Sequence, residues 1–143
     1  MTLKKPAKLV WIILILISVF AAVGSAETAV DLDLSACNRS ITYAQVVQVC
    51  NAPEGYDGKV FRLTGKFNYS EKLDTARIIF SDSAGCCELA LPFAPAEALS
   101  YPEDYPPLYS NITITARLAA DPSDPELSCQ FVDAVVEWKN EDV

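Results

Sequence analysis

The stretch that decides the fold reads KVFRLTGKFNY, residues 59–69. Apolar and polar side chains alternate along it with a period of two, which predicts a strand with one buried face. Its apolar phase consists of Phe61, Leu63, Gly65, Phe67 and Tyr69. A glycine in that phase indicates a bend, and such bends occur where a sheet closes into a barrel. We therefore expect this strand to be the first strand of a closed sheet.

The same alternation recurs downstream, separated by turn-forming residues. We expect further strands over residues 76–80, 86–93, 112–118 and 127–138. In the last of these the apolar phase slips from Phe131 to Val132, which predicts a β-bulge. A proline-rich break follows the third strand and includes a candidate helical turn at Ala94–Leu99. The pattern predicts a mainly β protein with a small five-stranded OB-like barrel. The alternative is a β-sandwich.

One helix is expected before the strands. Thr42 and Gln45 have the spacing of a capping box, while Pro53 and Gly55 mark the end of the helix. We expect this helix over residues 42–51, where it caps one end of the barrel. The domain boundaries are then a flexible leader over residues 27–40 and a folded domain over residues 41–139.

The N-terminal residues have the pattern of a secretory signal peptide. Three lysines precede an uncharged apolar run, Leu9–Val23, and the small residues Gly24-Ser25-Ala26 follow it. We expect cleavage after Ala26, so residues 1–26 are the signal peptide of a protein that is secreted or held in the cell envelope. One alternative is an uncleaved anchor, in which residues 9–23 make the only membrane contact. Another is lipidation of Cys37.

Charge and histidine content exclude several classes of function. The net charge is −8, and without residues 1–26 eight basic side chains stand against nineteen acidic ones, a net charge of −11. Lysine and arginine supply most nucleic-acid affinity, so we expect no nucleic-acid binding. The sequence contains no histidine, which removes Ser-His-Asp and Cys-His catalysis and histidine-based zinc sites. We expect no enzyme activity, no catalytic residues and no cofactor.

Several separated motifs resemble a known family. They are Pro53-Glu54, Tyr56, Gly58-Lys59-Val60, Arg62-Leu63 and Gly65; Asp82 with Gly85-Cys86-Cys87; Leu91-Pro92-Phe93; Tyr101-Pro102-Glu103-Asp104-Tyr105-Pro106; and Cys129 with Phe131. Over residues 42–135 this series is similar to uncharacterised exported proteins of anaerobic Gram-positive bacteria. The resemblance implies an OB-like barrel and no particular activity. Cys37 and Cys50 depart from the family pattern.

The five cysteines are candidates for covalent or metal chemistry. Cys37 and Cys50 enclose the start of the expected helix, where a disulfide would pin the leader to the helix; the alternative is two unpaired thiols. The alternation places Cys87 and Cys129 on the inner faces of the third and fifth strands, which are neighbours in an OB-like barrel. We expect a disulfide between them, a buried thiol pair, or a metal or redox site.

Cys86 is left as an outward-facing thiol near Asp82 and Glu88. Adjacent strand residues point to opposite faces, so we do not expect Cys86 and Cys87 to form a disulfide with each other or to coordinate the same metal ion. Acidic neighbours raise a thiol pKa, which makes Cys86 a poor nucleophile. The candidate ligands for a soft or borderline ion of unknown identity are Cys86, Cys87, Cys129 and Asp82.

A proline-stiffened loop carries Tyr101, Tyr105 and Tyr109. Tyrosine supplies contact area at low entropic cost, so this is a candidate ligand platform; the alternative is that the rings plug the barrel end. We expect an exported, non-catalytic OB-like binding module for an unknown small ligand or envelope protein. The alternative function is a metal- or redox-responsive envelope protein that uses Cys86, Cys87 and Cys129.

Overall fold

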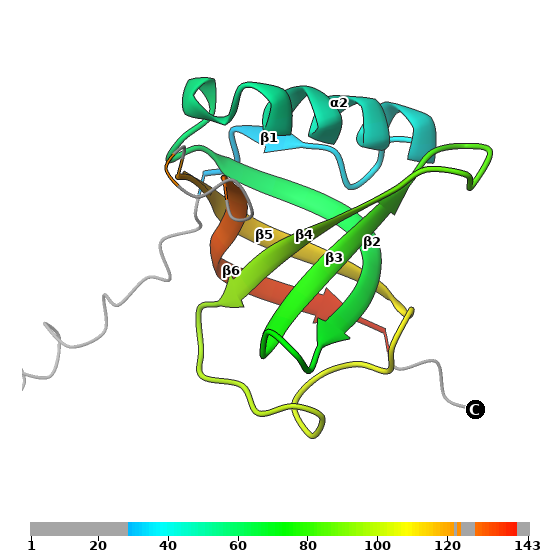
Figure 1. Cartoon of the computed structure of the whole chain (residues 1–143), viewed down its shortest axis with the longest axis vertical. Helices are drawn as coiled ribbons and strands as arrows, with labels where there is room; N and C mark the ends of the chain where they lie inside the picture. The colour runs from blue at the N-terminus through cyan, green and yellow to red at the C-terminus, as the bar shows by residue number, and fades with distance from the viewer. Residues whose placement is uncertain (1–28, 122, 124–127, 140–143) are drawn as a thin grey trace, which may run out of the picture.

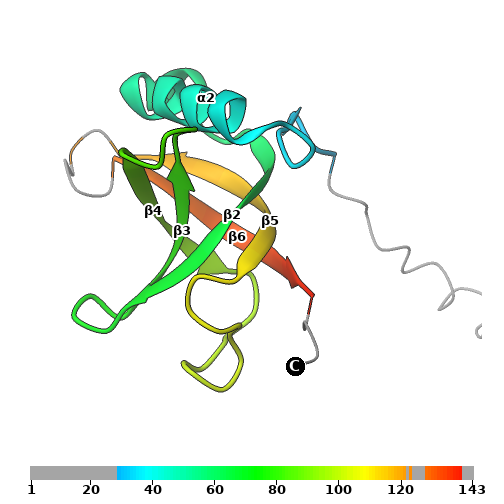
Figure 2. The same cartoon turned by 90° about the vertical axis from the view of Figure 1, so that its right-hand side faces the viewer.

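The protein is a small β-barrel with one helix across its end (Figures 1 and 2). The computed structural model describes residues 29–121, 123 and 128–139. The elements are β1 (Leu32–Asp33), α2 (Arg39–Asn51), the 3-10 turn η1 (Pro53–Gly55), β2 (Val60–Ser70), β3 (Thr75–Ser81), β4 (Glu88–Pro95), β5 (Asn111–Ala120) and β6 (Cys129–Trp138). The expected signal peptide, residues 1–26, lies outside the described residues.

The sheet closes on itself. Its strand order is β1-β2-β3-β4-β6-β5, and an additional pairing of β2 with β5 completes the ring. β4 and β6 run parallel, while the other barrel pairings are antiparallel. This is the topology of an OB-like barrel, so the predicted fold is confirmed, and ring closure rules out the alternative β-sandwich.

The bend predicted at Gly65 lies where β2 changes neighbours. Residues 60–66 of β2 pair with β5, and residues 66–70 pair with β3. A Cβ atom at Gly65 would lie 2.7 Å from Ile78 Cγ1 and 2.8 Å from the Ile79 carbonyl oxygen. Only glycine allows β2 and β3 to approach this closely, so the close approach explains the break in the apolar phase.

The core consists of the inward phases of the strands, as the alternation predicts. Phe61, Leu63, Phe67, Ala76, Ile78, Phe80, Leu91, Phe93, Ile112, Ile114, Ala116, Leu118, Cys129, Phe131 and Ala134 are buried. Leu34, Val46 and Val49 add the contribution of the N-terminal segment and of α2. One continuous apolar cluster therefore fills the barrel and extends under the helix.

The predicted bulge in the last strand is confirmed. Between Thr115 and Arg117 the pairing of β5 with β6 shifts, because Thr115 opposes Val135 whereas Arg117 opposes Val132. Asp133 lies inside the shift with a φ of 55° and pairs with Arg117 at 2.6 Å. The bulge moves the inward phase from Phe131 to Ala134, so the apolar phase slips as predicted, but the slip falls after Asp133 and not at Val132.

The start of the helix differs from the prediction. Asn38 is the N-cap, and its side-chain oxygen accepts a hydrogen bond from the Ile41 backbone N–H at 3.0 Å. Thr42 is instead buried one turn inside α2, where its hydroxyl donates to the Leu34 carbonyl at 3.4 Å. The expected capping box at Thr42 is therefore wrong, because a better cap precedes it by four residues.

The expected flexible leader is also wrong for the part that the structure describes. Leu32–Asp33 forms β1, which pairs in parallel with β2, and the Leu34 N–H donates to the Arg62 carbonyl at 2.8 Å. Since Leu34 is buried against the core, the barrel extends N-terminally beyond the expected boundary at residue 41.

Two further boundaries move. β4 begins at Glu88, so Cys86 and Cys87 belong to the preceding turn rather than to the strand. β4 continues to Pro95, and residues 96–110 form turns without a helix, so the candidate helical turn at Ala94–Leu99 is absent.

No helix among the described residues is long and apolar enough to cross a membrane.

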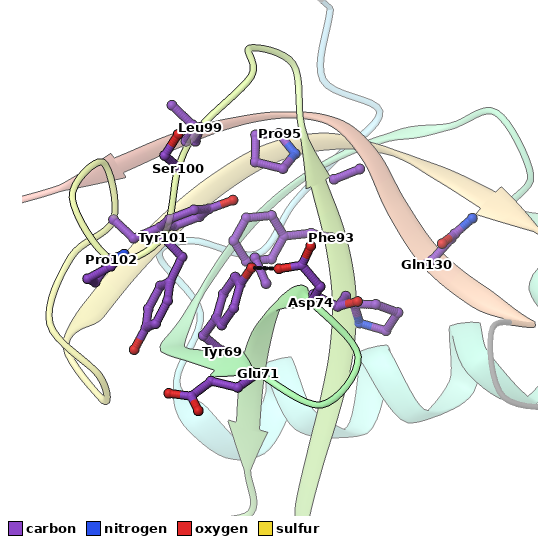
Figure 3. A pocket seen from close by; sticks show the side chains of 15 residues that line it. Tyr69, Glu71, Asp74, Phe93, Pro95, Leu99, Ser100, Tyr101, Pro102 and Gln130 are labelled. Carbon is purple, nitrogen blue, oxygen red and sulfur yellow. Dashed lines mark hydrogen bonds between the residues drawn. The ribbon is translucent and has the colours of Figure 1, made fainter.

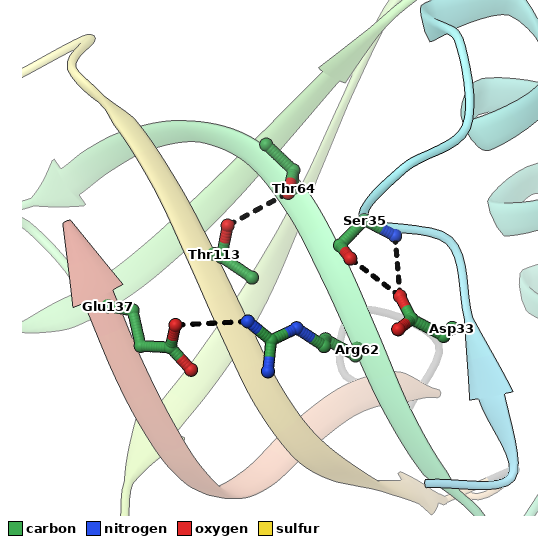
Figure 4. A network of polar contacts seen from close by, with 6 residues as sticks. All are labelled: Asp33, Ser35, Arg62, Thr64, Thr113 and Glu137. Atoms are coloured by element: carbon green, nitrogen blue, oxygen red, sulfur yellow. Dashed lines mark hydrogen bonds and ion pairs between the residues drawn. The ribbon is translucent and has the colours of Figure 1, made fainter. Parts of the chain in front are cut away.

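The outer face of β2 and β5 carries a polar network (Figure 4). Arg62 pairs with Glu137 of β6 at 3.0 Å, and the hydroxyls of Thr64 and Thr113 are 2.9 Å apart. These cross-strand contacts hold polar side chains on the solvent side of the closure between β2 and β5. They match the polar phase of the alternation.

Gly65→Ala is expected to lower the free energy of unfolding by roughly 2 kcal/mol, because the new methyl group must displace a backbone carbonyl. Urea denaturation measures this. Gly55→Ala is the matched control, since a Cβ there meets nothing within 4 Å. Similar losses for both variants would contradict the close-approach explanation.

Candidate functional sites

The turn between β3 and β4 is built around the Asp82 carboxylate. Its Oδ1 accepts the backbone N–H groups of Cys86 at 3.0 Å and Cys87 at 3.4 Å. Gly85, with a φ of 68°, lets the chain reverse at this point. Its N–H donates to the Asp82 carbonyl at 3.2 Å. The aspartate therefore shapes the turn and fixes the two cysteines beside it.

The two thiols lie on the same side as this carboxylate. Cys86 Sγ donates to Asp82 Oδ2 at 3.1 Å and lies 3.7 Å from Cys87 Sγ. One ligand atom from each of the three residues lies within 4.8 Å of the others, and both cysteines are exposed. The expectation that Cys86 and Cys87 point to opposite faces is wrong, because it assumed strand geometry for residues that lie in a turn.

The electrostatics of this turn favour a protonated Cys86. The hydrogen bond to Asp82 is the main cause that raises the pKa of Cys86 to about 11, and the same bond lowers the pKa of Asp82. The pKa of Tyr43 in α2 is raised as well. The larger cause is the partial burial of its ring, and the smaller one is the nearby electrostatic effect of Cys87, Asp82 and Cys86. Cys86 is thus a poor nucleophile at neutral pH, as its acidic neighbours predict.

A second site lies at the end of the barrel opposite α2. There the tyrosine loop, residues 96–110 after β4, folds back over the barrel (Figure 3). The rings of Tyr69 and Tyr101 stack with centroids 3.9 Å apart and an interplanar angle of 2°. Tyr105 stacks on buried Phe67 with centroids 5.3 Å apart. Tyr101 and Tyr105 therefore combine both predicted roles, since they cover the barrel end and also line a groove.

This tyrosine groove has a volume of about 960 Å³. Its walls come from β2, β3, β4, β6 and the loop after β4, and they include Tyr69, Glu71, Asp74, Phe93, Tyr101 and Tyr105. The Tyr69 hydroxyl donates to the Asp74 carboxylate, and this bond raises the pKa of Tyr69 to about 12. The groove therefore combines apolar ring surface with acidic groups.

Tyr109 does not share this groove. It has a φ of 66°, and its side chain is exposed. The third predicted member of the ligand platform is therefore separate from Tyr101 and Tyr105 in the groove. Sequence reasoning missed Tyr69, Glu71 and Asp74. Tyr69 belongs to the apolar phase of the first predicted strand, and its place at the strand end was the signal that it lines the rim.

The remaining cysteines are arranged differently from either expected pairing. Cys50 Sγ lies 2.7 Å from Cys129 Sγ, whereas Cys37 is exposed before the other end of α2. The helix rises about 1.5 Å per residue, so Arg39, which opens α2 just after Cys37, lies about 16 Å along the axis from Cys50. Cys87 lies in the exposed turn, not beside Cys129, because β4 begins after it. The proposed set of three thiols and Asp82 is thus not assembled.

No protein-family model matches the chain, and no curated protein matches its sequence significantly. The resemblance to exported proteins of anaerobic Gram-positive bacteria therefore stays a prediction.

Asp82→Asn is expected to increase the alkylation rate of Cys86 at pH 8 about tenfold or more. The amide removes the negative charge that disfavours the thiolate, so the pKa falls from about 11 toward an ordinary thiol value and more thiolate is present. Peptide mass spectrometry after timed iodoacetamide treatment measures the rate. Cys37 is the internal control, and an equal increase at Cys37 would indicate general loosening instead.

Proposed function

We propose that this protein is an exported, non-catalytic OB-like binding module of the cell envelope that takes a small saccharide ligand in the tyrosine groove. The stacked pair Tyr69 and Tyr101 is the observation that carries the proposal. Tyr69 lies at the end of β2, and the pair lines the groove together with Glu71 and Asp74 of the turn between β2 and β3, the first two barrel strands (Figure 3). That turn and the adjoining face are where OB folds bind oligonucleotides and oligosaccharides.

The charge of the groove favours a saccharide over an oligonucleotide. Glu71 and Asp74 line it, and the chain as a whole has a net charge of −8. A polyanion would be repelled, because its binding depends on lysine and arginine that neutralise phosphates. A neutral or cationic sugar offers hydroxyl groups to the carboxylates and a flat apolar face to the rings.

The same residues support binding without catalysis. Asp74 accepts the Tyr69 hydroxyl, so its carboxylate is engaged in holding the ring. The sequence contains no histidine to serve as a proton shuttle. A rigid aromatic rim with an acidic border is suited to recognition by shape and hydrogen bonding.

The test uses N-acetylglucosamine oligomers, their cationic de-N-acetylated counterparts, and an oligothymidylate. We expect titration calorimetry to detect a saccharide but not the oligonucleotide. Tyr101→Ala should weaken binding at least about tenfold, since it removes one ring face of the groove. Tyr101→Phe, which keeps that face, should bind as the wild type does.

Tyr109→Ala is the matched control, because it removes an exposed tyrosine outside the groove. Thermal unfolding of each variant checks that the barrel is intact. Binding of the oligothymidylate alone, or an equal loss in Tyr101→Ala and Tyr109→Ala, would contradict the proposal.

The turn with Asp82, Cys86 and Cys87 supports a second candidate function, binding of a soft or borderline metal ion. The observation in its favour is that three ligand atoms lie within 4.8 Å of one another. Thiolate ligands select ions such as Cu(I) and Zn(II), and a bound cation would offset the carboxylate that keeps Cys86 protonated. Cys129 has no part in this version of the metal hypothesis, because it lies against Cys50.

Cd²⁺ is a suitable probe, because binding to thiolates produces ultraviolet charge-transfer absorption. Under anaerobic conditions we expect the absorption in the wild type and in Cys129→Ala, and its loss in Cys86→Ser. Cys37→Ser is the control for nonspecific thiol binding. Loss in Cys129→Ala with retention in Cys86→Ser would contradict the turn as the metal site.

A further inference from the structure

We infer that Cys50 and Cys129 form a disulfide bond, which makes them a covalent modification site that joins the helix to the last strand of the barrel. The two sulfur atoms face each other 2.7 Å apart, although the residues are 79 positions apart in the sequence. The other close sulfur contact is the one between the adjacent Cys86 and Cys87. This covalent link does not depend on the proposed ligand.

Both cysteines are held in place by regular structure. Cys50 lies in the last turn of α2, beside the buried Val49, and Cys129 is the first residue of β6, where it pairs with Ala120 of β5. Cys129 is only 5% exposed, and Cys50 is partly buried against the core. Because neither residue belongs to a loop, their encounter follows from the packing of the helix on the barrel.

The other three cysteines are poorly placed for this reaction. Cys37 precedes the far end of the helix, and the Cys86 thiol donates a hydrogen bond to the Asp82 carboxylate, which keeps it protonated. A bond between Cys86 and Cys87 would close a small ring that strains the intervening peptide. The expected oxidised product therefore contains one disulfide and three free thiols.

The oxidation requires a disulfide reagent, such as oxidised glutathione or a protein dithiol carrier in its disulfide form. Cys50 is the attacking group, because it is the more exposed thiol and the hydrogen bond from Cys129 lowers its pKa. Its thiolate attacks one sulfur of the reagent and expels the other as a thiolate, which takes up the Cys50 proton. Cys129 then attacks the Cys50 sulfur, and its proton leaves with the second thiol.

The closed loop contains both candidate sites. Residues 50–129 include all of β2, β3, β4 and β5, and with them the Asp82 turn and every residue of the tyrosine groove except Gln130. A bond at this position restricts the unfolded chain over most of the domain, and long loops gain the most in the chain-entropy description. We therefore expect the oxidised protein to have the higher Tm.

The experiment equilibrates the full chain with oxidised glutathione, then alkylates it in urea without reductant. We expect an intact mass lower by two hydrogen atoms before alkylation, three alkylated cysteines after it, and one cross-linked peptide pair containing Cys50 and Cys129. Reduction should lower the Tm on the order of 10 °C. Five alkylated cysteines, or a cross-link between any other pair, would overturn the inference.

Two variants separate the bond from general thiol effects. In Cys50→Ala/Cys129→Ala the Tm should no longer respond to reductant, whereas in Cys37→Ser it should respond as in the wild type. A reductant-dependent Tm in the double variant would also overturn the inference. If the double variant does not fold, the peptide cross-link in the wild type still decides the question, and saccharide binding is measured separately.

Discussion

Barrel closure through β2 is the constraint on which the rest of the structure depends. This strand pairs with β5 over its first half and with β3 over its second half, so it must bend and coil between them. Gly65 permits that bend, because any side chain there would collide with β3. The parallel pairing of β4 with β6 completes the ring, so each of the five barrel strands pairs with two others of the barrel. Closure therefore satisfies the edges that an open sheet would expose.

Closure also determines where a binding or reactive site can lie, because it fills the interior with apolar side chains and leaves polar groups at the ends. The β3–β4 turn brings Asp82 and its cysteines to the end covered by α2, while the β2–β3 turn and the tyrosine loop meet at the opposite end (Figure 1). The two candidate sites are thus separated by the length of the barrel. A ligand at one of them has no direct contact with the other, so binding at each is testable independently.

The sequence allowed the strands, their inward phases, the bend and the bulge to be predicted, because each follows from a period-two pattern that local residues carry. It did not allow the ends of elements to be placed. The alternation runs on through Cys87, yet the Asp82 carboxylate accepts two backbone N–H groups there and holds the chain in a turn. In the same way Asn38 outcompetes Thr42 as a cap. These are choices between local hydrogen bonds, and a hydrophobic pattern does not register them.

Contacts between distant residues were the least accessible from sequence. The groove needs Tyr69 and Tyr101 from different segments, and Cys50 meets Cys129 only because the helix lies across the barrel end. Once they are placed, the cysteines differ in chemistry through their surroundings. A carboxylate keeps Cys86 protonated in the exposed turn, whereas Cys50 has a thiol neighbour and no such charge. In the proposed oxidation, an oxidant of the disulfide class therefore reacts at Cys50 and Cys129, and the turn thiols remain reduced, as the proposed metal site requires.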